Sequence, residues 1–578
     1  MPLKKNQETI STLFAERKKF VLIGLTGRTG SGCTTAANIL ESAPTFPTVS
    51  SINIGNTPFY QGNDVLRYNI LREYALKNFK KFYSIKVSDL ISAYLLSTDA
   101  EEVANFISKS CTPPVPIEKI SEILKNGEFS RGNIKKYRQS FEKIIDHSTK
   151  FTMTDSEKSK FNLILKMVRV FTAKFKMELN KINPDLYIYT YQAAGNSIRK
   201  IGKISSNYQE MEFIPESIFH LPETINRIIK LIRKINDHVF IVIDAIRNPF
   251  EARFFKDRYS AFYLVSVNAP DDDRKSYLQD VHKFSVDKFD EIELRESGKT
   301  KISHADFISQ NVKKCIEMAD IHIFNPRNEL GNNNVLKAQL AWYFSLMLHP
   351  GLVTPRTIER VMQVAYTAKS NSGCISRQVG AVITDHENST KAIGWNDVAK
   401  GQVSCNLRSF EGLMNSFDEI TYSKYERNSS EFRNAAQKRY TEISSIDKDS
   451  GRNHSYCFKD IKNEMDKKGN QVHTRALHAE ENAFLQLTKH GGMGIQGGKL
   501  YTTASPCELC AKKAYQLGIE EIIYIDPYPG IAQDHILSIG SKQPQLIQFT
   551  GAVGKGFHQL YEPILPYKDE LDYITSDN

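Results

Sequence analysis

Short apolar runs alternate with longer amphipathic stretches through the first 330 residues of the chain. Four of these runs predict buried strands, at Phe20–Thr26, Val239–Asp244, Ala261–Val267 and Ile321–Phe324. Strands that alternate with helical periodicity are typical of an α/β fold with a parallel sheet. We therefore expect an α/β domain over residues 20–330, preceded by a polar N-terminal arm at residues 1–19.

The interval between the first two predicted strands is rich in Lys and Tyr. From about residue 60 to 235 its apolar positions follow a mostly helical period, as at residues 161–170. This pattern predicts a helical insertion within the first domain. An Asn-rich turn at residues 331–334 and an apolar helix come next, so we expect a linker helix over residues 331–354.

A second α/β unit is predicted over residues 355–578. Its apolar runs indicate strands at Gly380–Thr384, Lys391–Trp395, Lys499–Thr503 and Glu521–Ile525. A polar, charged segment at about residues 400–472 interrupts this pattern and is expected to be an insertion. The whole chain is thus predicted to be an α/β protein of two domains.

Composition and cysteine usage indicate where the protein works. The 578 residues carry a net charge of +10, which indicates either a Lys-biased surface or local basic clefts for an anionic substrate such as a nucleotide. The cysteines form no disulfide framework and the N-terminus has no apolar signal segment, so we expect the protein to be located in the reducing cytoplasm. No run approaches the ~18 apolar residues of a membrane span, so no membrane contact is expected.

The strongest chemical signal is a split cluster near the C-terminus, His478-Ala-Glu480 followed by Pro506-Cys507-Glu-Leu-Cys510. Its spacing matches the H-x-E…P-C-x-x-C signature of zinc-dependent nucleobase deaminases. Cys507 and Cys510 are three positions apart and would share a face of a helix, for which Pro506 suits the first position. The predicted zinc ligands are His478, Cys507 and Cys510, and Glu480 is the predicted catalytic residue.

Three protein ligands leave one tetrahedral position open, as a catalytic zinc requires. Zinc would lower the pKa of water there to about 7. Glu480 would take a proton from this water, pass it to the ring nitrogen, and later assist the departure of ammonia. A closed zinc knuckle with His473 as fourth ligand is the structural alternative. Cys405, His454, Cys457 and His473 are candidates for a second zinc site, with free polar or core residues as the simpler interpretation.

The C-terminal unit, from about residue 355 to 530, resembles the deoxycytidylate deaminases. Besides the zinc cluster, the matching pieces are Ser376–Ile383 and Gly394–Asn396. The resemblance implies a cytidine deaminase-like αβα domain in which Asn396 binds the sugar beside the pyrimidine; a turn residue is the alternative. Arg377 is a candidate for a phosphate contact or a surface residue, and Tyr528 for a pocket wall or a plain turn.

A glycine-rich loop follows the first predicted strand, with the sequence Gly27-Arg28-Thr29-Gly30-Ser31-Gly32-Cys33-Thr34. It matches the phosphate-binding pattern G-x-x-x-x-G-K-[ST], except that Cys33 replaces the lysine. Backbone amides could still bind a nucleoside triphosphate, and Thr34 could hold Mg²⁺. The cation that meets the β- and γ-phosphates is missing, and Arg28 or Arg274 are candidates to replace it.

Other segments of the first domain resemble P-loop nucleoside and coenzyme kinases. Ile241–Asp244 resembles the strand that ends in a magnesium-binding Asp, and residues 243–251, 268–274 and 319–325 resemble kinase segments. The resemblance implies a P-loop kinase-like domain with a parallel sheet. Three roles stay open for it: a nucleotide-binding regulator with slow or absent hydrolysis, an active kinase or NTPase, and a structural relic.

The fusion of these two domains resembles the bacterial anti-phage dCTP deaminases. The resemblance implies that dCTP, and often dCMP, is converted to the uracil nucleotide and ammonia, which depletes the deoxycytidine nucleotides that phage replication needs. It also implies that the P-loop domain restrains the deaminase until infection. Expected partners are the free nucleotide, further copies of this chain in a homo-oligomer, and an RNA or protein regulator. The alternatives are a nucleic-acid-editing cytosine deaminase, an ordinary dCMP deaminase, and a nucleotide-sensing protein with structural zinc.

Overall fold

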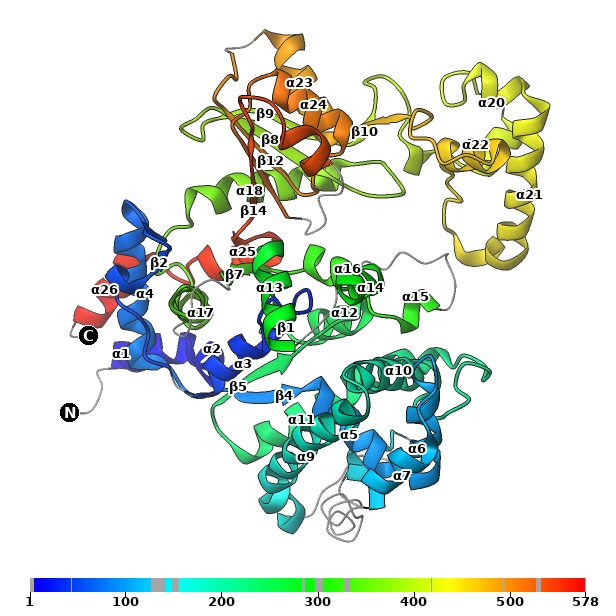
Figure 1. Ribbon diagram of the computed structural model, residues 1–578. Coiled ribbons are helices and arrows are strands. Elements are labelled where there is room, and N and C mark those ends of the chain that lie inside the picture. Colours follow the sequence, from blue (N-terminus) through cyan, green and yellow to red (C-terminus); the bar gives the residue numbers. More distant parts are fainter. Residues whose placement is uncertain are drawn as a thin grey trace. The chain divides into compact units, whose positions relative to one another are not determined.

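The computed structural model describes residues 5–42, 44–125, 141–147, 155–282, 286–296, 305–326, 333–416, 418–491, 494–525 and 532–576. The chain forms two compact units (Figure 1). Unit 1 comprises Met1–Thr354 and Lys555–Asn578, and unit 2 comprises Pro355–Gly554. No helix among the described residues is both long and apolar enough to cross a membrane.

Unit 1 is built on a parallel sheet, as predicted. Its strands are β1 (Phe20–Thr26), β4 (Tyr83–Lys86), β5 (Val239–Asp244), β6 (Phe262–Asn268) and β7 (Ile321–Phe324), which follow one another in the order β7-β6-β1-β5-β4. All four neighbouring pairs are parallel. The strand β4 was not predicted, since it lies inside the stretch whose mostly helical period predicts a helical insertion.

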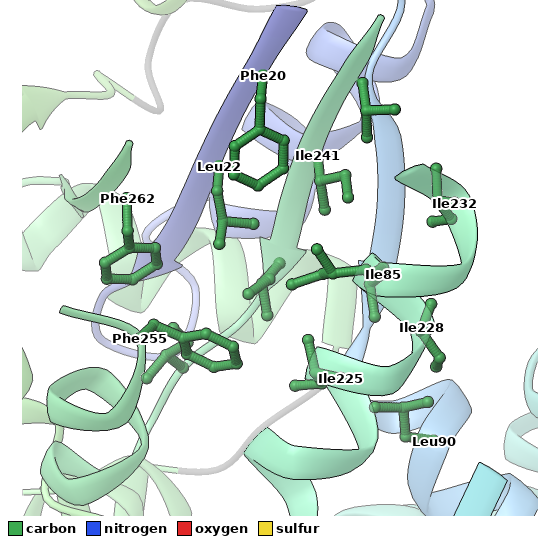
Figure 2. Close-up of a cluster of buried hydrophobic side chains, with 14 of the residues drawn as sticks. Phe20, Leu22, Ile85, Leu90, Ile225, Ile228, Ile232, Ile241, Phe255 and Phe262 are labelled. Carbon is green, nitrogen blue, oxygen red and sulfur yellow. The ribbon is translucent and has the colours of Figure 1, made fainter. Parts of the chain in front are cut away.

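One hydrophobic core of unit 1 lies between this sheet and the helices α11 (His220–Ile235) and α12 (Pro249–Arg258) (Figure 2). Phe20, Leu22 and Ile241 reach it from the strands. Ile225 and Ile228 reach it from α11, in which apolar residues recur at the spacing that forms one face of a helix. Each fully buried isoleucine of this core stabilises the fold by about 1.5–3 kcal/mol.

The Lys- and Tyr-rich stretch forms a second hydrophobic core, to which helices contribute most of the residues. These helices are α5 (Val87–Ser97), α6 (Ala100–Lys109), α7 (Ile117–Lys125), α9 (Asp155–Ile182) and α10 (Leu186–Ile201), together with Leu221 of α11. The remaining elements of unit 1 between residues 33 and 317 are α3 (Cys33–Ser42), β2 (Asn53–Ile54), β3 (Thr57–Pro58), α4 (Asn63–Asn78), α13 (Asp271–His282), α14 (Val286–Glu296), α15 (Ala305–Ile308) and α16 (Val312–Glu317).

Three predicted boundaries differ from the structure. The expected polar arm forms α1 (Lys5–Leu13) and α2 (Ala15–Lys19), and the ring of Phe14 between them is buried against His349, with centroids 4.3 Å apart. The expected linker helix is α17 (Asn334–Leu348), which is almost wholly buried in unit 1. A linker would be exposed, whereas α17 is part of the core.

The C-terminal helices α25 (Gly554–Tyr561) and α26 (Tyr567–Thr575) also belong to unit 1 rather than to the second domain, where we had expected them. Trp342 Nε1 of α17 donates a hydrogen bond to the Tyr561 hydroxyl at 3.2 Å. His349 Nε2 lies 2.9 Å from the Glu570 carboxylate. These contacts hold the chain's last helices against unit 1.

Unit 2 has a mixed sheet between two helical layers. Its strands are β8 (Gly380–Thr384), β9 (Thr390–Trp395), β12 (Lys499–Thr502), β13 (Glu521–Tyr524) and β14 (Gln545–Gln548), in the order β14-β13-β12-β8-β9. Alternate residues of β8 face opposite cores: Ala381 and Ile383 contact the core of α23 (Ala479–His490) and α24 (Glu508–Gln516), and Val382 that of α18 (Thr357–Ala368). The strands predicted for this unit are confirmed.

The insertion of unit 2 has a small core of its own. The short strands β10 (Asp397–Val398) and β11 (Ala476–Leu477) pair antiparallel and frame it. Its helices are α19 (Phe410–Asn415), α20 (Lys424–Asn428), α21 (Ser430–Asp447) and α22 (Phe458–Asp466) (yellow in Figure 1). In its interior the Arg408 guanidinium donates hydrogen bonds to Glu426 and to the Tyr456 hydroxyl.

Candidate functional site

The residues of the H-x-E and C-x-x-C motifs meet at the beginnings of two helices. His478 is the N-cap of α23 and Cys507 that of α24, so the predicted helical position of Pro506 lies outside the helix. The His478 Nδ1 atom lies 3.3 Å from Cys507 Sγ and 3.5 Å from Cys510 Sγ. Of the described His, Cys, Asp and Glu residues, only these three bring their ligand atoms within 4.8 Å of one another.

The chemistry of this donor set suits zinc. Two thiol sulfurs and one imidazole nitrogen are the soft ligands that zinc prefers, and zinc bonds of usual length place S and N about 3.6 Å apart. A hydrogen bond from Cys510, joined by one from His478, lowers the pKa of Cys507 to about 3, while holding that proton raises the pKa of Cys510. These hydrogen bonds favour the thiolate of Cys507, the form of cysteine that binds a metal.

Glu480 lies beside this cluster in the first turn of α23. It is 3% exposed, and its Oε1 atom accepts a hydrogen bond of 2.9 Å from the Thr502 hydroxyl at the end of β12. Burial raises the pKa of the Glu480 carboxyl, which favours its protonated form. Sequence reasoning missed Thr502, although it ends the strand that leads to the cysteines.

A cavity of about 570 Å³ opens in front of the cluster, and Arg377 and Asn396 are in its wall. The Asn396 side chain accepts a hydrogen bond of 2.6 Å from the Val379 amide and donates one of 2.7 Å to the Arg377 carbonyl. It therefore braces the segment that carries Arg377. Tyr528, predicted as a further wall residue, lies outside the described residues.

The insertion also contributes to this cavity, which the sequence did not indicate. Lys459 of α22 and Arg475 before β11 are in its wall. The Nη1 atom of Arg475 is buried and has no hydrogen-bond partner among the described residues. Lys459 Nζ lies 3.5 Å from Gln471 Oε1 and 3.6 Å from Asp460 Oδ1. With Arg377, three cationic side chains thus line the cavity.

The residues suggested for a second zinc site do not converge. His454 Nε2 lies 3.1 Å from Asp447 Oδ2, and His473 Nε2 lies 3.7 Å from Asp466 Oδ2. Cys405 and Cys457 lie in the cavity wall, and burial raises the pKa of each thiol. His473 likewise does not join the cluster of His478, so the structure does not assemble the closed knuckle.

The glycine-rich loop connects β1 to α3, as predicted. Gly30 and Gly32 have φ values of 85° and 111°, in the left-handed region where glycine is favoured. Cys33, in the place of the usual lysine, begins α3 and is 8% exposed. Burial, helped by the nearby Asp244 carboxylate, raises the pKa of its thiol to about 12.

The arginine side chains around this loop are already paired with carboxylates of the protein. Arg28 Nη1 donates to Asp271 Oδ1 at 2.5 Å, and Arg28 also pairs with Glu293. Arg274 donates to Glu293 at 2.6 Å and to the Thr29 carbonyl at 2.8 Å. Both candidates for the missing lysine therefore lie at the loop, and both are engaged within the protein.

Comparison with known proteins connects unit 2 to characterised relatives. The family model for the cytidine and deoxycytidylate deaminase zinc-binding region matches residues 355–526. Deoxycytidylate deaminase of Enterobacteria phage T2 is 31% identical over 170 residues, which are 29% of this chain and 79% of that protein. The T4 enzyme is 29% identical over 170 residues, 29% of this chain and 77% of that protein.

Among solved structures, that of apo dCMP deaminase from cyanophage S-TIM5 is 18% identical and covers 34% of this chain and 100% of that chain. Its TM-score of 0.19 is too low to support an argument about the fold. The relation to the T2 enzyme over most of that enzyme's length is the stronger finding. On this ground, the chain belongs to the cytidine and deoxycytidylate deaminase family.

Proposed function

We propose that unit 2 removes the amino group of a deoxycytidine nucleotide, with dCTP as the main substrate and dCMP as a second one. Water and the cytosine nucleotide give the uracil nucleotide and ammonia. The observation that carries this proposal is that His478 and Cys507 line one cavity with the buried Glu480, and that Cys510 completes their ligand cluster. The family supports it, since the T2 and T4 relatives are deoxycytidylate deaminases.

In this mechanism Glu480 moves the protons. A zinc ion held by His478, Cys507 and Cys510 would supply the Lewis acid that makes water nucleophilic near neutral pH. Glu480 takes a proton from the attacking water and carries it to N3 of the cytosine as the water oxygen bonds to C4. It then takes the second proton from that oxygen and gives it to the exocyclic amine, which leaves as ammonia as the C4 carbonyl forms. The Thr502 hydroxyl keeps the carboxyl aimed in one direction through its hydrogen bond of 2.9 Å.

The cations of the cavity support an anionic substrate. Arg377, Lys459 and Arg475 together offer three positive charges in the wall of the same cavity. The buried, unpaired Nη1 atom of Arg475 favours a ligand that accepts hydrogen bonds, because such a group is costly to leave unsatisfied. A triphosphate would engage more of these charges than a monophosphate, which favours dCTP.

Asn396 is the proposed contact to the sugar. Its carboxamide has already used one acceptor and one donor in bracing the backbone of Val379 and Arg377. An asparagine side chain can make further bonds through its second N–H and its second lone pair. The same residue can therefore hold the wall and meet a sugar hydroxyl.

Unit 1 is proposed as a regulatory domain that binds a nucleoside triphosphate with Mg²⁺ and hydrolyses it slowly or not at all. The loop between β1 and α3 supports binding, and Cys33 in place of lysine supports slow chemistry. We further propose a cytoplasmic homo-oligomer that depletes deoxycytidine nucleotides in anti-phage defence. An RNA or protein regulator would release the deaminase on infection.

A dCMP deaminase of ordinary nucleotide metabolism is the second candidate. The relatives from phages T2 and T4, both deoxycytidylate deaminases, favour it. Such an enzyme would prefer dCMP and would not need three cations near the substrate phosphates. Comparing dCTP with dCMP therefore separates the two candidates directly.

The test is a deamination panel with the purified full chain loaded with zinc. Uracil products and ammonia are measured for dCTP, dCMP, CTP, deoxycytidine and single-stranded DNA, with Glu480→Ala as the inactive control. We expect the highest kcat/KM for dCTP, then dCMP. Preference for dCMP would favour the second candidate, and product from DNA alone would overturn both.

A further inference from the structure

The glycine-rich loop already holds an anion that belongs to the protein itself. The Thr29 amide donates to both Glu296 carboxylate oxygens, at 3.2 and 3.1 Å, and the Thr29 hydroxyl donates to one of them at 2.5 Å. Glu296 is the last residue of α14 and is fully buried. A carboxylate therefore sits on a backbone N–H that a phosphate would use in a loop of this kind.

An arginine neutralises this buried carboxylate. Arg247 Nη1 donates to Glu296 at 2.5 Å and to the Thr29 hydroxyl at 3.1 Å. Glu293, one turn earlier in α14, binds Arg28 and Arg274. Two carboxylates of one helix thus hold three arginines at the loop. An uncompensated buried carboxylate would be strongly destabilising, so the carboxylate and its partners form one unit.

A cavity of about 380 Å³ adjoins the loop, with Thr29, Thr34 and Arg247 in its wall. Its volume is within the range of small-molecule sites, roughly 300–1,000 Å³. The helices α9 and α10 close its other side with Asn180, Tyr187 and Tyr191, among others. It therefore joins the anion-binding loop to a wall with aromatic rings.

Two residues of the cavity wall also have buried polar atoms without hydrogen-bond partners among the described residues. The amide oxygens of Asn180 and Gln310, both wall residues, are buried and accept no hydrogen bond from any described residue. A buried acceptor without a donor costs about 1–3 kcal/mol, so such atoms point to a donor that completes the site. The amino groups of a base and the hydroxyls of a sugar are such donors.

We propose that this cavity binds the base and sugar of a nucleotide, and that Glu296 holds the position of its phosphate until the nucleotide displaces it. On binding, the phosphate takes over the Thr29 amide and Arg247, and the Glu296 side chain leaves the loop. No covalent bond changes. The arginines that α14 now engages would then supply the positive charge that lysine provides in other loops of this pattern.

The first test compares wild type with Glu296→Gln in the full chain. Binding of ATP, GTP and inorganic tripolyphosphate is measured by titration calorimetry. Glutamine keeps the size of the side chain but removes the competing charge, so we expect tripolyphosphate and the accepted nucleotide to bind about 10-fold tighter. Asp290→Asn, an exposed change of equal charge on the same helix, should leave affinity within twofold.

The second test separates the cavity from the loop. Asn180→Leu removes an unpaired acceptor, so it should weaken the accepted nucleotide at least fivefold and leave tripolyphosphate unchanged. If Glu296→Gln leaves the affinity for tripolyphosphate unchanged, Glu296 does not compete with a phosphate at the loop. If Asn180→Leu leaves the affinity for the nucleotide unchanged, the cavity does not bind the base and sugar. If Glu296→Gln does not fold, Glu296→Asp, with a shorter reach, should still tighten binding about threefold. This inference rests on the proposed binding of a nucleotide to unit 1, not on deamination by unit 2. If wild type binds neither ATP nor GTP, that proposed function fails, whereas wild-type nucleotide binding that neither variant changes overturns this inference alone.

Discussion

Two cysteines at the beginnings of helices show how differently the two units treat the same side chain. Cys507 is the N-cap of α24 and Cys33 is the first residue of α3. The pKa of Cys507 is lowered to about 3, because Cys510 and His478 give it hydrogen bonds. That of Cys33 is raised to about 12, because it is buried beside Asp244. A helix N-terminus alone therefore does not decide whether a thiol ionises.

The difference extends to the groups around each cysteine. In unit 2, the donor atoms of three side chains point at one another beside a cavity, which is the arrangement that a cation completes. In unit 1, the arginines at the loop are each paired with a carboxylate, which is an arrangement that an incoming anion must exchange. The site in unit 2 is arranged to receive a cation, whereas at the loop of unit 1 a carboxylate of the protein occupies the position that we propose for a phosphate.

The largest effect should follow from Glu480→Gln in unit 2. Glutamine keeps the size of the side chain and can still bond to Thr502, but it cannot exchange protons. We expect kcat for deamination to fall by about 10²–10⁴-fold. Uracil formation measured by chromatography gives the rate, and elemental analysis should show unchanged zinc. Wild-type activity in this variant would mean that another group transfers the proton.

Cys507→Ser should weaken zinc binding at the same site, because it removes one of the three predicted ligands. A serine hydroxyl stays protonated near neutral pH and is a poor zinc ligand. Zinc affinity should therefore fall by more than about 100-fold, which exceeds the loss expected when only a residue that hydrogen-bonds to a zinc ligand is changed. Competition with a chromogenic chelator measures it. Cys374→Ser is the matched control, since Cys374 lies in the same cavity wall but outside the ligand cluster. Equal zinc loss in both variants would contradict the assignment.

Arg475→Gln should have a smaller and more selective effect. Loss of one charge-assisted hydrogen bond to phosphate corresponds to about a 10-fold rise in KM for dCTP, with deoxycytidine unaffected because it has no phosphate. Steady-state kinetics on both substrates measure this. Lys468→Gln, an exposed change of equal charge in the same insertion, should leave both KM values alone. A matching rise for deoxycytidine would indicate a general distortion of the cavity.

The sequence predicted what is local. Each main strand carries its own apolar run, and the H-x-E and C-x-x-C motifs place their residues at helix starts through spacing alone. The strand β4 escaped because Tyr83-Ser-Ile-Lys86 has only one strongly apolar side chain and lies within a helical stretch. The last helices were misassigned because their contacts with Trp342 and His349 are made across more than 200 positions.

At both sites, sequence reasoning missed the residues that the fold brings together from distant positions in the sequence. Thr29 and Glu296 are 267 positions apart, and Glu296 sits in a charged stretch that resembles a solvated helix face. Lys459 and Arg475 belong to a polar insertion in which many charges look alike. Only the fold selects which of those charges reach a cavity, so residue type and spacing could not single them out.

Cys33→Ser should have the smallest effect, and it tests the prediction that the Cys33 thiol of unit 1, unlike Cys507 of unit 2, stays protonated. Because the thiol is neutral at pH 7, it supplies no charge to the loop, and nucleotide affinity should change less than about twofold. Its folded pKa of about 12 exceeds the ordinary 9.0, so the folded state binds the extra proton and wild type loses stability as pH rises above 9. Serine lacks this loss. Between pH 8 and 10 the free energy of unfolding of wild type should therefore fall by about 1 kcal/mol more than that of Cys33→Ser, measured by urea denaturation. Equal pH dependence would mean that the Cys33 thiolate is tolerated in the folded protein, and the contrast with Cys507 would then rest on geometry alone.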